Sequence, residues 1–217
     1  MGRARINDGT GVNVVNVTKY SNSLQVVGDY AGIGGVINFY QTALPADATI
    51  AAGSALFAAR CSAGMAATSR IVISRVILTF IISTAFTTIG GGRRFSLYKG
   101  SGADPTGGIT DTIVKKNTAD DAISLGEARH CGGAGSLIST TGITWETAEI
   151  ATMHVGNLQA LKAYRTQYLE FDMASTHPLT LSPGEVIGLR NPVVLDPAGA
   201  GQYQLAMTLE FCEVANW

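Results

Sequence analysis

Residues 202–211 read Gln-Tyr-Gln-Leu-Ala-Met-Thr-Leu-Glu-Phe, with a large apolar side chain at every second position. A period of two places these side chains on one face of a β-strand and the residues between them on the other face. The apolar face comprises Tyr203, Leu205, Met207, Leu209 and Phe211. The preceding Pro-Ala-Gly-Ala-Gly at 197–201 favours a turn. The C-terminal region therefore predicts a half-buried strand.

A second strand is predicted just upstream, over residues 186–191. It follows Ser-Pro-Gly-Glu at 182–185, where Pro183 presets its own φ and Gly184 accepts a positive φ, as the central positions of a type II turn require. The pattern predicts two antiparallel strands joined by a short loop.

Residues 69–86 are rich in β-branched side chains, which favour strand over helix. The segment is long for one strand, so we expect a bend or bulge near Ser74 and Arg75. Glycines at 90–92 interrupt the pattern. It resumes at 93–98, with Phe95 and Leu97 facing one way, which predicts another antiparallel pair.

Further strands are predicted at 12–17, 24–30, 36–41 and 55–60, giving about eight to ten in all. Short strands with almost no helix between them predict an all-β, jelly-roll-like antiparallel β-sandwich, and the Cys…Trp…Cys spacing of immunoglobulin domains is missing. The one helical turn expected lies around 147–153.

The length of 217 residues suits one β-sandwich domain spanning 1–217. Residues 1–20 are compatible with an extended N-terminal arm. Residues 100–142 are rich in Gly, Ser and Thr and lack long apolar periodicity, so we expect a long surface excursion that carries contacts or function.

The composition argues against several classes of partner. Only 14% of residues are charged, against about 25% in typical soluble chains, so we expect part of the surface to be covered by protein. A net charge of -1 gives no electrostatic footprint for nucleic acid. The most apolar run, 71–82, is far shorter than the ~20 residues of a membrane-spanning helix. The first residues lack the apolar stretch of a secretory signal.

The cysteines and histidines form no recognisable site in the sequence. Three widely spaced cysteines suggest neither disulfides nor zinc, and buried hydrophobes in a reducing cytoplasm are the simplest interpretation; they are Cys61, Cys131 and Cys212. His154 and His177 lie in separate contexts, and His177 before Pro178 suggests a turn-capping role. His130 and Cys131 are adjacent, so on a strand they would point to opposite faces and would rarely share an ion.

Three further patterns are weak candidates for chemistry. Glu146 and Glu149 could form a carboxylate pair, although solvated charges are the simpler interpretation. Glycines 90–92 with Arg93 and Arg94 suit phosphate but lack the Lys-Ser/Thr ending of a P-loop. Possible calcium ligands without EF-hand spacing are Asp111, Asp120 and Asp121. No GxSxG elbow is present. We therefore assign no catalytic, cofactor-binding or metal residue and expect no cofactor.

Several strand-and-turn patterns occur between about residues 45 and 217. They are Ala51-Ala52-Gly53-Ser54-Ala55-Leu56-Phe57-Ala58-Ala59-Arg60, Arg75-Val76 to Thr84-Ala85-Phe86, Phe95-Ser96-Leu97-Tyr98, Thr106-Gly107-Gly108, His177-Pro178-Leu179 to Gly184-Glu185 to Leu189-Arg190-Asn191, and Glu210-Phe211-Cys212-Glu213-Val214. Together they resemble a family of virion structural proteins from tailed phages. The portion before about residue 45 does not align with it.

The resemblance implies capsid decoration or cementing by a non-enzymatic homo-oligomer, with a trimer favoured, located in a virion assembled in the host cytoplasm. Its partners would be copies of itself and the major capsid protein or other virion proteins, with no nucleic acid and no membrane. A carbohydrate- or receptor-binding module of a tail or head fibre is the alternative, in which Trp145, Trp217 and Tyr164 could stack on sugar. A cupin-like metalloenzyme would need an HxH histidine cluster that the sequence lacks.

Overall fold

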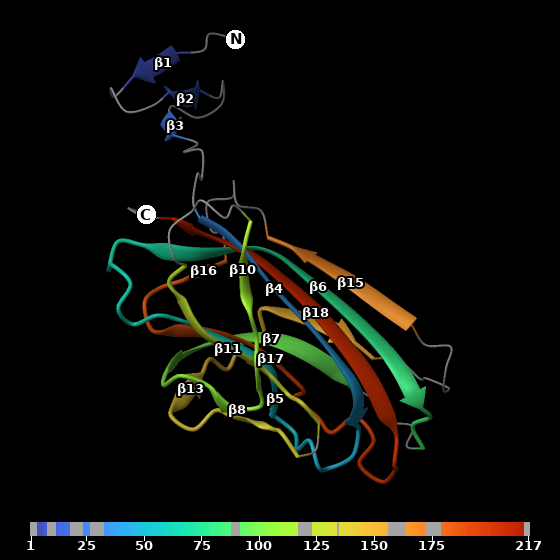
Figure 1. Ribbon diagram of the computed structural model, residues 1–217. Coiled ribbons are helices and arrows are strands. Elements are labelled where there is room, and N and C mark those ends of the chain that lie inside the picture. The colour runs from blue at the N-terminus through green and yellow to red at the C-terminus, as the bar shows by residue number, and fades with distance from the viewer. Residues whose placement is uncertain are drawn as a thin grey trace.

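The protein is all-β over the residues that its computed structural model describes (Figure 1). These residues are 4–7, 12–17, 24–26, 33–87, 92–116, 123–133, 135–155, 164–171 and 179–214, and they contain strands and no helix. The strands are β1 (Ala4–Asn7), β2 (Val12–Val17), β3 (Leu24–Val26), β4 (Ile33–Pro45), β5 (Ala55–Cys61), β6 (Arg70–Thr84), β7 (Arg94–Gly102), β8 (Thr106–Gly107), β9 (Ile109–Thr110), β10 (Ile113–Lys115), β11 (Leu125–His130), β12 (Ile138–Ser139), β13 (Ile143–Trp145), β14 (Ala151–His154), β15 (Tyr164–Glu170), β16 (Thr180–Leu181), β17 (Glu185–Arg190) and β18 (Gln202–Val214).

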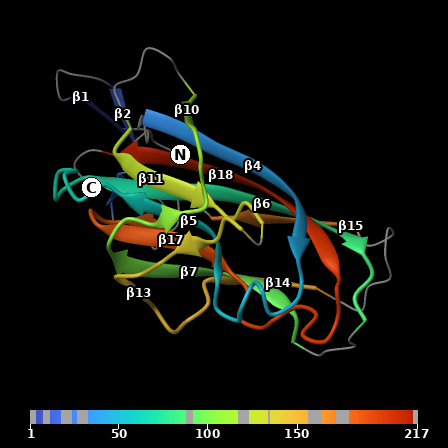
Figure 2. The same ribbon diagram turned by 60° about the horizontal axis from the view of Figure 1, so that its bottom comes forward.

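Two antiparallel sheets form the sandwich. The first, sheet I, has the order β10-β4-β18-β6-β15, with β16 also paired to β6. The second, sheet II, has the order β13-β7-β17-β5-β11-β9, with β14 also paired to β7. Figure 1 and Figure 2 show β4, β18, β6 and β15 side by side in one layer and β7, β17 and β5 in the other. The predicted antiparallel β-sandwich is confirmed.

The apolar faces of the two sheets meet in one continuous core. Its C-terminal part is the predicted set on β18, which is 2% exposed or less at every member from Tyr203 to Phe211. Phe80 of β6 and Tyr203 of sheet I contact Phe95 of β7 in sheet II, with ring centroids 5.3 and 5.7 Å from that of Phe95. Interlocking aromatic rings thus join the two layers.

The pairing of neighbouring strands differs from the sequence-based prediction. The turn at Pro183 is confirmed, since Gly184 has φ +80° and the Glu185 N–H donates to the Ser182 carbonyl at 3.0 Å. However, this turn leads from β16 in sheet I to β17 in sheet II, and β17 does not pair with β18 either. The expected pair of β6 with β7 is also wrong, because these strands lie in opposite sheets. Apolar alternation is satisfied equally by pairing in one sheet or by facing across the core.

The predicted irregularity in β6 is confirmed. Glu210 of β18 pairs with Arg75, whereas the next residue, Phe211, pairs with Ile73. Ser74 is therefore the extra residue of a β-bulge, and its hydroxyl donates to the Glu210 carbonyl at 3.1 Å. The bulge lets Ile71 and Ile73 stay in the core on one side and Val76 on the other.

The predicted surface excursion, residues 100–142, is more structured than expected. Its residues 101–104 and 109–110 are exposed. However, β10 pairs with β4 in sheet I, and β11 pairs with β5 in sheet II, where Leu125 and Ala128 are buried. Small Gly, Ser and Ala residues between these short strands hide the apolar period on which the prediction relied.

Two other predictions concern the helical turn expected before β14 and the strands of the N-terminal region. The helical turn expected around 147–153 is wrong, because 147–150 is a bend and β14 begins at Ala151. In the N-terminal region, β2 matches the predicted strand 12–17, and β1, β2 and β3 pair in a three-stranded antiparallel sheet. The single-domain assignment and the N-terminal arm stay predictions.

Candidate functional site

Alternate residues of β7 build a polar cluster on the outer face of sheet II. Phe95 and Leu97 point into the core, so Arg94, Ser96 and Tyr98 lie on the opposite face. Residues 146–150 interrupt the pairing of β13 and β14 along β7. A backbone hydrogen bond to β7 closes each end of this segment. The Glu146 N–H donates to the Lys99 carbonyl, and the Ile150 N–H donates to the Leu97 carbonyl, each at 2.8 Å.

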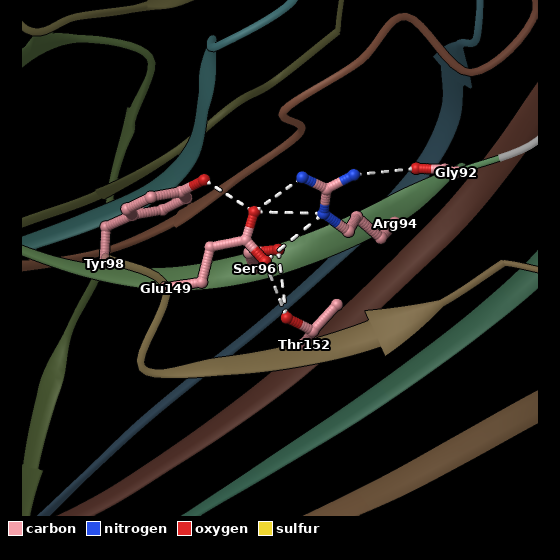
Figure 3. Close-up of polar contacts among 6 residues, drawn as sticks. All are labelled: Gly92, Arg94, Ser96, Tyr98, Glu149 and Thr152. Carbon is pink, nitrogen blue, oxygen red and sulfur yellow. Dashed lines mark hydrogen bonds and ion pairs between the residues drawn. The ribbon is translucent and has the colours of Figure 1, made fainter. Parts of the chain in front are cut away.

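The Glu149 carboxylate lies at the centre of this cluster, as Figure 3 shows. Arg94 donates to it through Nε at 3.0 Å and Nη2 at 2.7 Å, a fork-like arrangement. The Tyr98 hydroxyl donates to the same carboxylate at 3.0 Å and the Thr152 hydroxyl at 2.8 Å. These hydrogen bonds, with that from Arg94 the largest cause, lower the pKa of Glu149 from 4.5 to about 2.

This geometry makes Glu149 a structural clamp. A carboxylate with so low a pKa stays ionised near neutrality and is poorly suited to general acid catalysis. Burial raises the pKa of Tyr98, and the hydrogen bond to Glu149 adds to that effect, so the phenol keeps its proton. The expectation of solvated charges is wrong for Glu149, whereas Glu146 is exposed and the two do not form a pair.

Trp145 lies beside the clamp, flat against two glycines. A Cβ at Gly100 would come within 3.0 Å of the indole Cε3, and one at Gly188 would collide with Cη2. The Arg190 guanidinium lies 5.1 Å from the Trp145 ring and 5.0 Å from the Tyr98 ring. Trp145 also packs on a small second core formed by Ala55, Ala58, Ile138 and Val186. Its indole is thus fixed between strands and a cation.

A hollow of about 510 Å³ opens beside Trp145. Its lining consists of Gly100, Ser101, Thr144, Trp145, Glu146, Thr147, Ala148 and Glu185. Glu185 is held by Lys99 Nζ at 2.8 Å and by the Ser182 N–H at 2.6 Å. The hollow therefore combines one aromatic side chain with carboxylates and hydroxyls, a set that can bind a polar organic ligand.

Sequence reasoning singled out Trp145 and Glu149 but missed their partners. The sequence pattern places Arg94 only in a phosphate-binding motif and does not mark Tyr98, Thr152 or Arg190 as site residues. The polar alternation on β7 was a usable signal for Arg94 and Tyr98. Arg190 and Thr152 reach the site only through the pairing of β7 with β17 and β14, which the sequence does not reveal.

The His130–Cys131 pair belongs to the core. His130 is 8% exposed, stacks on Phe39 with ring centroids 4.7 Å apart, and has its Nδ1 2.7 Å from Asp111 Oδ1. Asp111, expected as a possible calcium ligand, thus pairs with a histidine. The Cys131 Sγ contacts the Gly133 carbonyl at 3.7 Å, so the two neighbours do not share a ligand.

The remaining candidates are dispersed. His154 is exposed at the end of β14. Arg93 is 4% exposed, with its Cζ 5.3 Å from the Phe86 ring. Tyr164 is described as part of the β15 backbone. The candidates that lie outside the described residues are Gly90, Gly91, Asp120, Asp121, His177 and Trp217.

The three cysteines are free and buried, as predicted. Burial raises the pKa of Cys61 to about 11, and it also raises those of Cys131 and Cys212. Such thiols are rarely ionised near neutrality and are unreactive.

Within the described ranges, no group of three His, Cys, Asp or Glu side chains is arranged to hold a metal ion. The same residues include no helix that could cross a membrane. Comparison with protein-family models, with curated proteins and with solved structures finds no match to this chain.

Proposed function

We propose that this protein is a non-enzymatic structural subunit of a virion, a capsid decoration or cement protein that assembles with copies of itself and with capsid proteins. The observation that carries the proposal is the outer face of sheet I. Its strands are long, with 13 residues in β4, 15 in β6 and 13 in β18, and pair side by side. They offer a broad sheet surface for another protein.

Three successive cross-strand rows of this face carry no charged side chain. Register places Asn38 beside Thr208 and Ile77, Tyr40 beside Ala206 and Thr79, and Gln204 beside Ile81. We call these eight residues the neutral face. In a row beyond it, Glu210 pairs with Arg75 and Lys116, so this charged group lies at one end of the neutral face. Neutral faces are favoured at protein interfaces, whose centres are depleted of charge.

The neutral face is also held in one arrangement. The Tyr40 hydroxyl donates to Gln204 Oε1 at 2.8 Å, and the Thr208 hydroxyl donates to Asn38 Oδ1 at 2.7 Å, each bond crossing between β4 and β18. Tyr40 is nevertheless 58% exposed. Side chains fixed before association lose less conformational entropy when a partner binds.

A second copy of this chain is the occupant we propose for the neutral face. From strand spacing of about 4.8 Å and rows about 6.8 Å apart, three strands by three rows cover roughly 300 Å². A patch of that area would form the centre of a standard interface of about 800 Å² per partner. A face without net charge does not repel its own copy.

Two further observations bear on the proposal. The chain passes repeatedly between the sheets, with β4, β6, β15 and β18 in sheet I and β5, β7, β14 and β17 in sheet II, which supports the jelly-roll-like form of the prediction.

A fibre-borne carbohydrate- or receptor-binding module is the second candidate, and the hollow beside Trp145 is the observation that favours it.

Sedimentation of the purified protein tests the assembly proposal. We expect a homo-oligomer, with a trimer favoured, and co-sedimentation with capsids. Ala206→Lys places a charge at the centre of the neutral face and should give monomers. Thr141→Lys, at an exposed turn near sheet II, is the matched control and should sediment like the unmodified protein. A monomer that does not associate with particles would refute the proposal.

A further inference from the structure

The hollow beside Trp145 has the features of a ligand site rather than of a packing defect. Its volume of about 510 Å³ lies within the range of small-molecule sites. The two short elements around it, β13 and the loop 146–150, are both tied to β7. The clamp at Glu149 fixes that loop by five hydrogen bonds, one residue beyond Ala148 of the lining. The hollow is therefore formed before any ligand enters.

Trp145 provides a rigid aromatic surface in this lining. Gly100 and Gly188 allow the indole to lie on the sheet, since a side chain at either position would meet it. Arg190 holds the indole by its guanidinium and is itself anchored, donating to the Gly53 carbonyl from Nε at 2.9 Å and Nη2 at 2.7 Å. The part of the indole that lines the hollow is held in place in this way, so it can contact the apolar C–H groups of a sugar with little loss of entropy.

The polar groups of the hollow suit hydroxyl ligands. Ser101, Thr144 and Thr147 are exposed and can both donate and accept hydrogen bonds. Glu146 is also exposed, and no described residue donates a hydrogen bond to its carboxylate. Carboxylates accept only, so they pair with ligand groups that donate, as sugar hydroxyls do.

Charge narrows the class of ligand. The charged side chains of the lining are Glu146 and Glu185, and Lys99 neutralises only Glu185. The Arg190 guanidinium contacts the Trp145 ring but is not part of the lining. Sialic acids, uronic acids and phosphates would be repelled by the remaining negative charge. We propose that the hollow beside Trp145 is a binding site for a neutral saccharide. The site is separate from the neutral face and does not depend on the assembly proposal.

Tryptophan fluorescence provides a direct test. The chain has two tryptophans, so Trp217→Phe leaves Trp145 as the only reporter. In that background we expect saturable quenching or shifting of the emission by neutral trisaccharides of glucose, galactose or N-acetylglucosamine, titrated to millimolar concentrations. Sialyllactose, of similar size but anionic, should bind at least tenfold more weakly than the best neutral trisaccharide.

Substitutions then locate the site. Ala148→Arg fills the hollow from an exposed loop position and should weaken binding at least tenfold in isothermal titration calorimetry. Trp145→Ala should do the same, and its thermal unfolding shows whether it folds. Ile109→Ala changes an exposed apolar residue at the opposite edge of sheet II, outside both the hollow and the neutral face; it is the matched control and should leave binding unchanged.

The outcomes separate the two proposals. Ala148→Arg should keep the sedimentation of the unmodified protein, because it lies outside the neutral face. Absence of binding by every neutral trisaccharide, equal binding by Ala148→Arg, or tighter binding of sialyllactose would each overturn the saccharide site, whatever the oligomeric state proves to be.

Discussion

At the scale of single residues, Glu149 shows how one carboxylate can organise a surface. Its five hydrogen bonds come from Arg94, Tyr98 and Thr152, on two different strands. The side chains of Arg94 and Glu149 keep 29% and 25% of their exposure, so water screens part of their attraction. The ion pair therefore contributes less to stability than its short distance alone would suggest.

Glu149→Gln should lower the free energy of unfolding by about 1–2 kcal/mol at neutral pH, because it removes charge-assisted hydrogen bonds. Glu146→Gln, three residues away and exposed, should change it by less than about 0.5 kcal/mol. Urea unfolding of the three proteins measures the difference. Equal effects of the two substitutions would show that Glu149 does not act as a clamp.

The stability difference between the unmodified protein and Glu149→Gln should also depend on pH. The pKa of Glu149 falls from 4.5 to about 2 on folding, so the unfolded chain takes up the proton first as the pH drops. The stabilisation is fully present above about pH 5.5 and is lost between about pH 4.5 and pH 2. Unfolding curves of the two proteins at pH 7, 4 and 3 should therefore show a stability difference that becomes smaller as the pH falls. A constant difference would contradict the lowered pKa.

At the scale of an element, the bulge at Ser74 keeps both halves of β6 in register. Without the extra residue, side chains on one side of the bulge would turn to the opposite face of the sheet. Ile71 and Ile73, each 0% exposed, would then exchange positions with their outward-facing neighbours or pull β18 out of register.

Deleting Ser74 should therefore cost several kcal/mol of stability, since it exposes large apolar side chains. Ser74→Ala is the matched control, because it keeps the bulge and loses only the hydrogen bond to the Glu210 carbonyl, about 0.5–1.5 kcal/mol. Soluble yield and chemical denaturation compare the two. A deletion no more harmful than the alanine substitution would show that the bulge does not set the register.

At the scale of the whole molecule, the two sheets have different outer surfaces. Sheet II is partly covered by its own chain, since Ile138, Ile143 and Trp145 pack on Ala58 and Val186. Sheet I presents the neutral face, with the charged group of Glu210, Arg75 and Lys116 beyond one end of it. This asymmetry fits the two proposals, in which sheet I binds another copy of the protein and the hollow on sheet II binds a saccharide.

Self-association through the neutral face should depend little on ionic strength, because no charged pair lies among its eight residues. We expect the dissociation constant from sedimentation to change less than about threefold between low and high sodium chloride, since screening acts on charged pairs. An interface built on the charged row at Glu210 would instead weaken markedly with salt. Ala206→Lys, which should lower association at every salt concentration, provides the control.

The sequence alone determined the all-β class, the alternating face of β18, the bulge in β6 and the burial of the cysteines, because each depends on local periodicity or on side-chain shape. Only the tertiary structure decided which strands pair, and hence that β6 and β7 lie in opposite sheets. It also brought Arg94, Glu149 and Arg190 together around Trp145. The physical reason is that an apolar face specifies burial but not the partner against which it is buried.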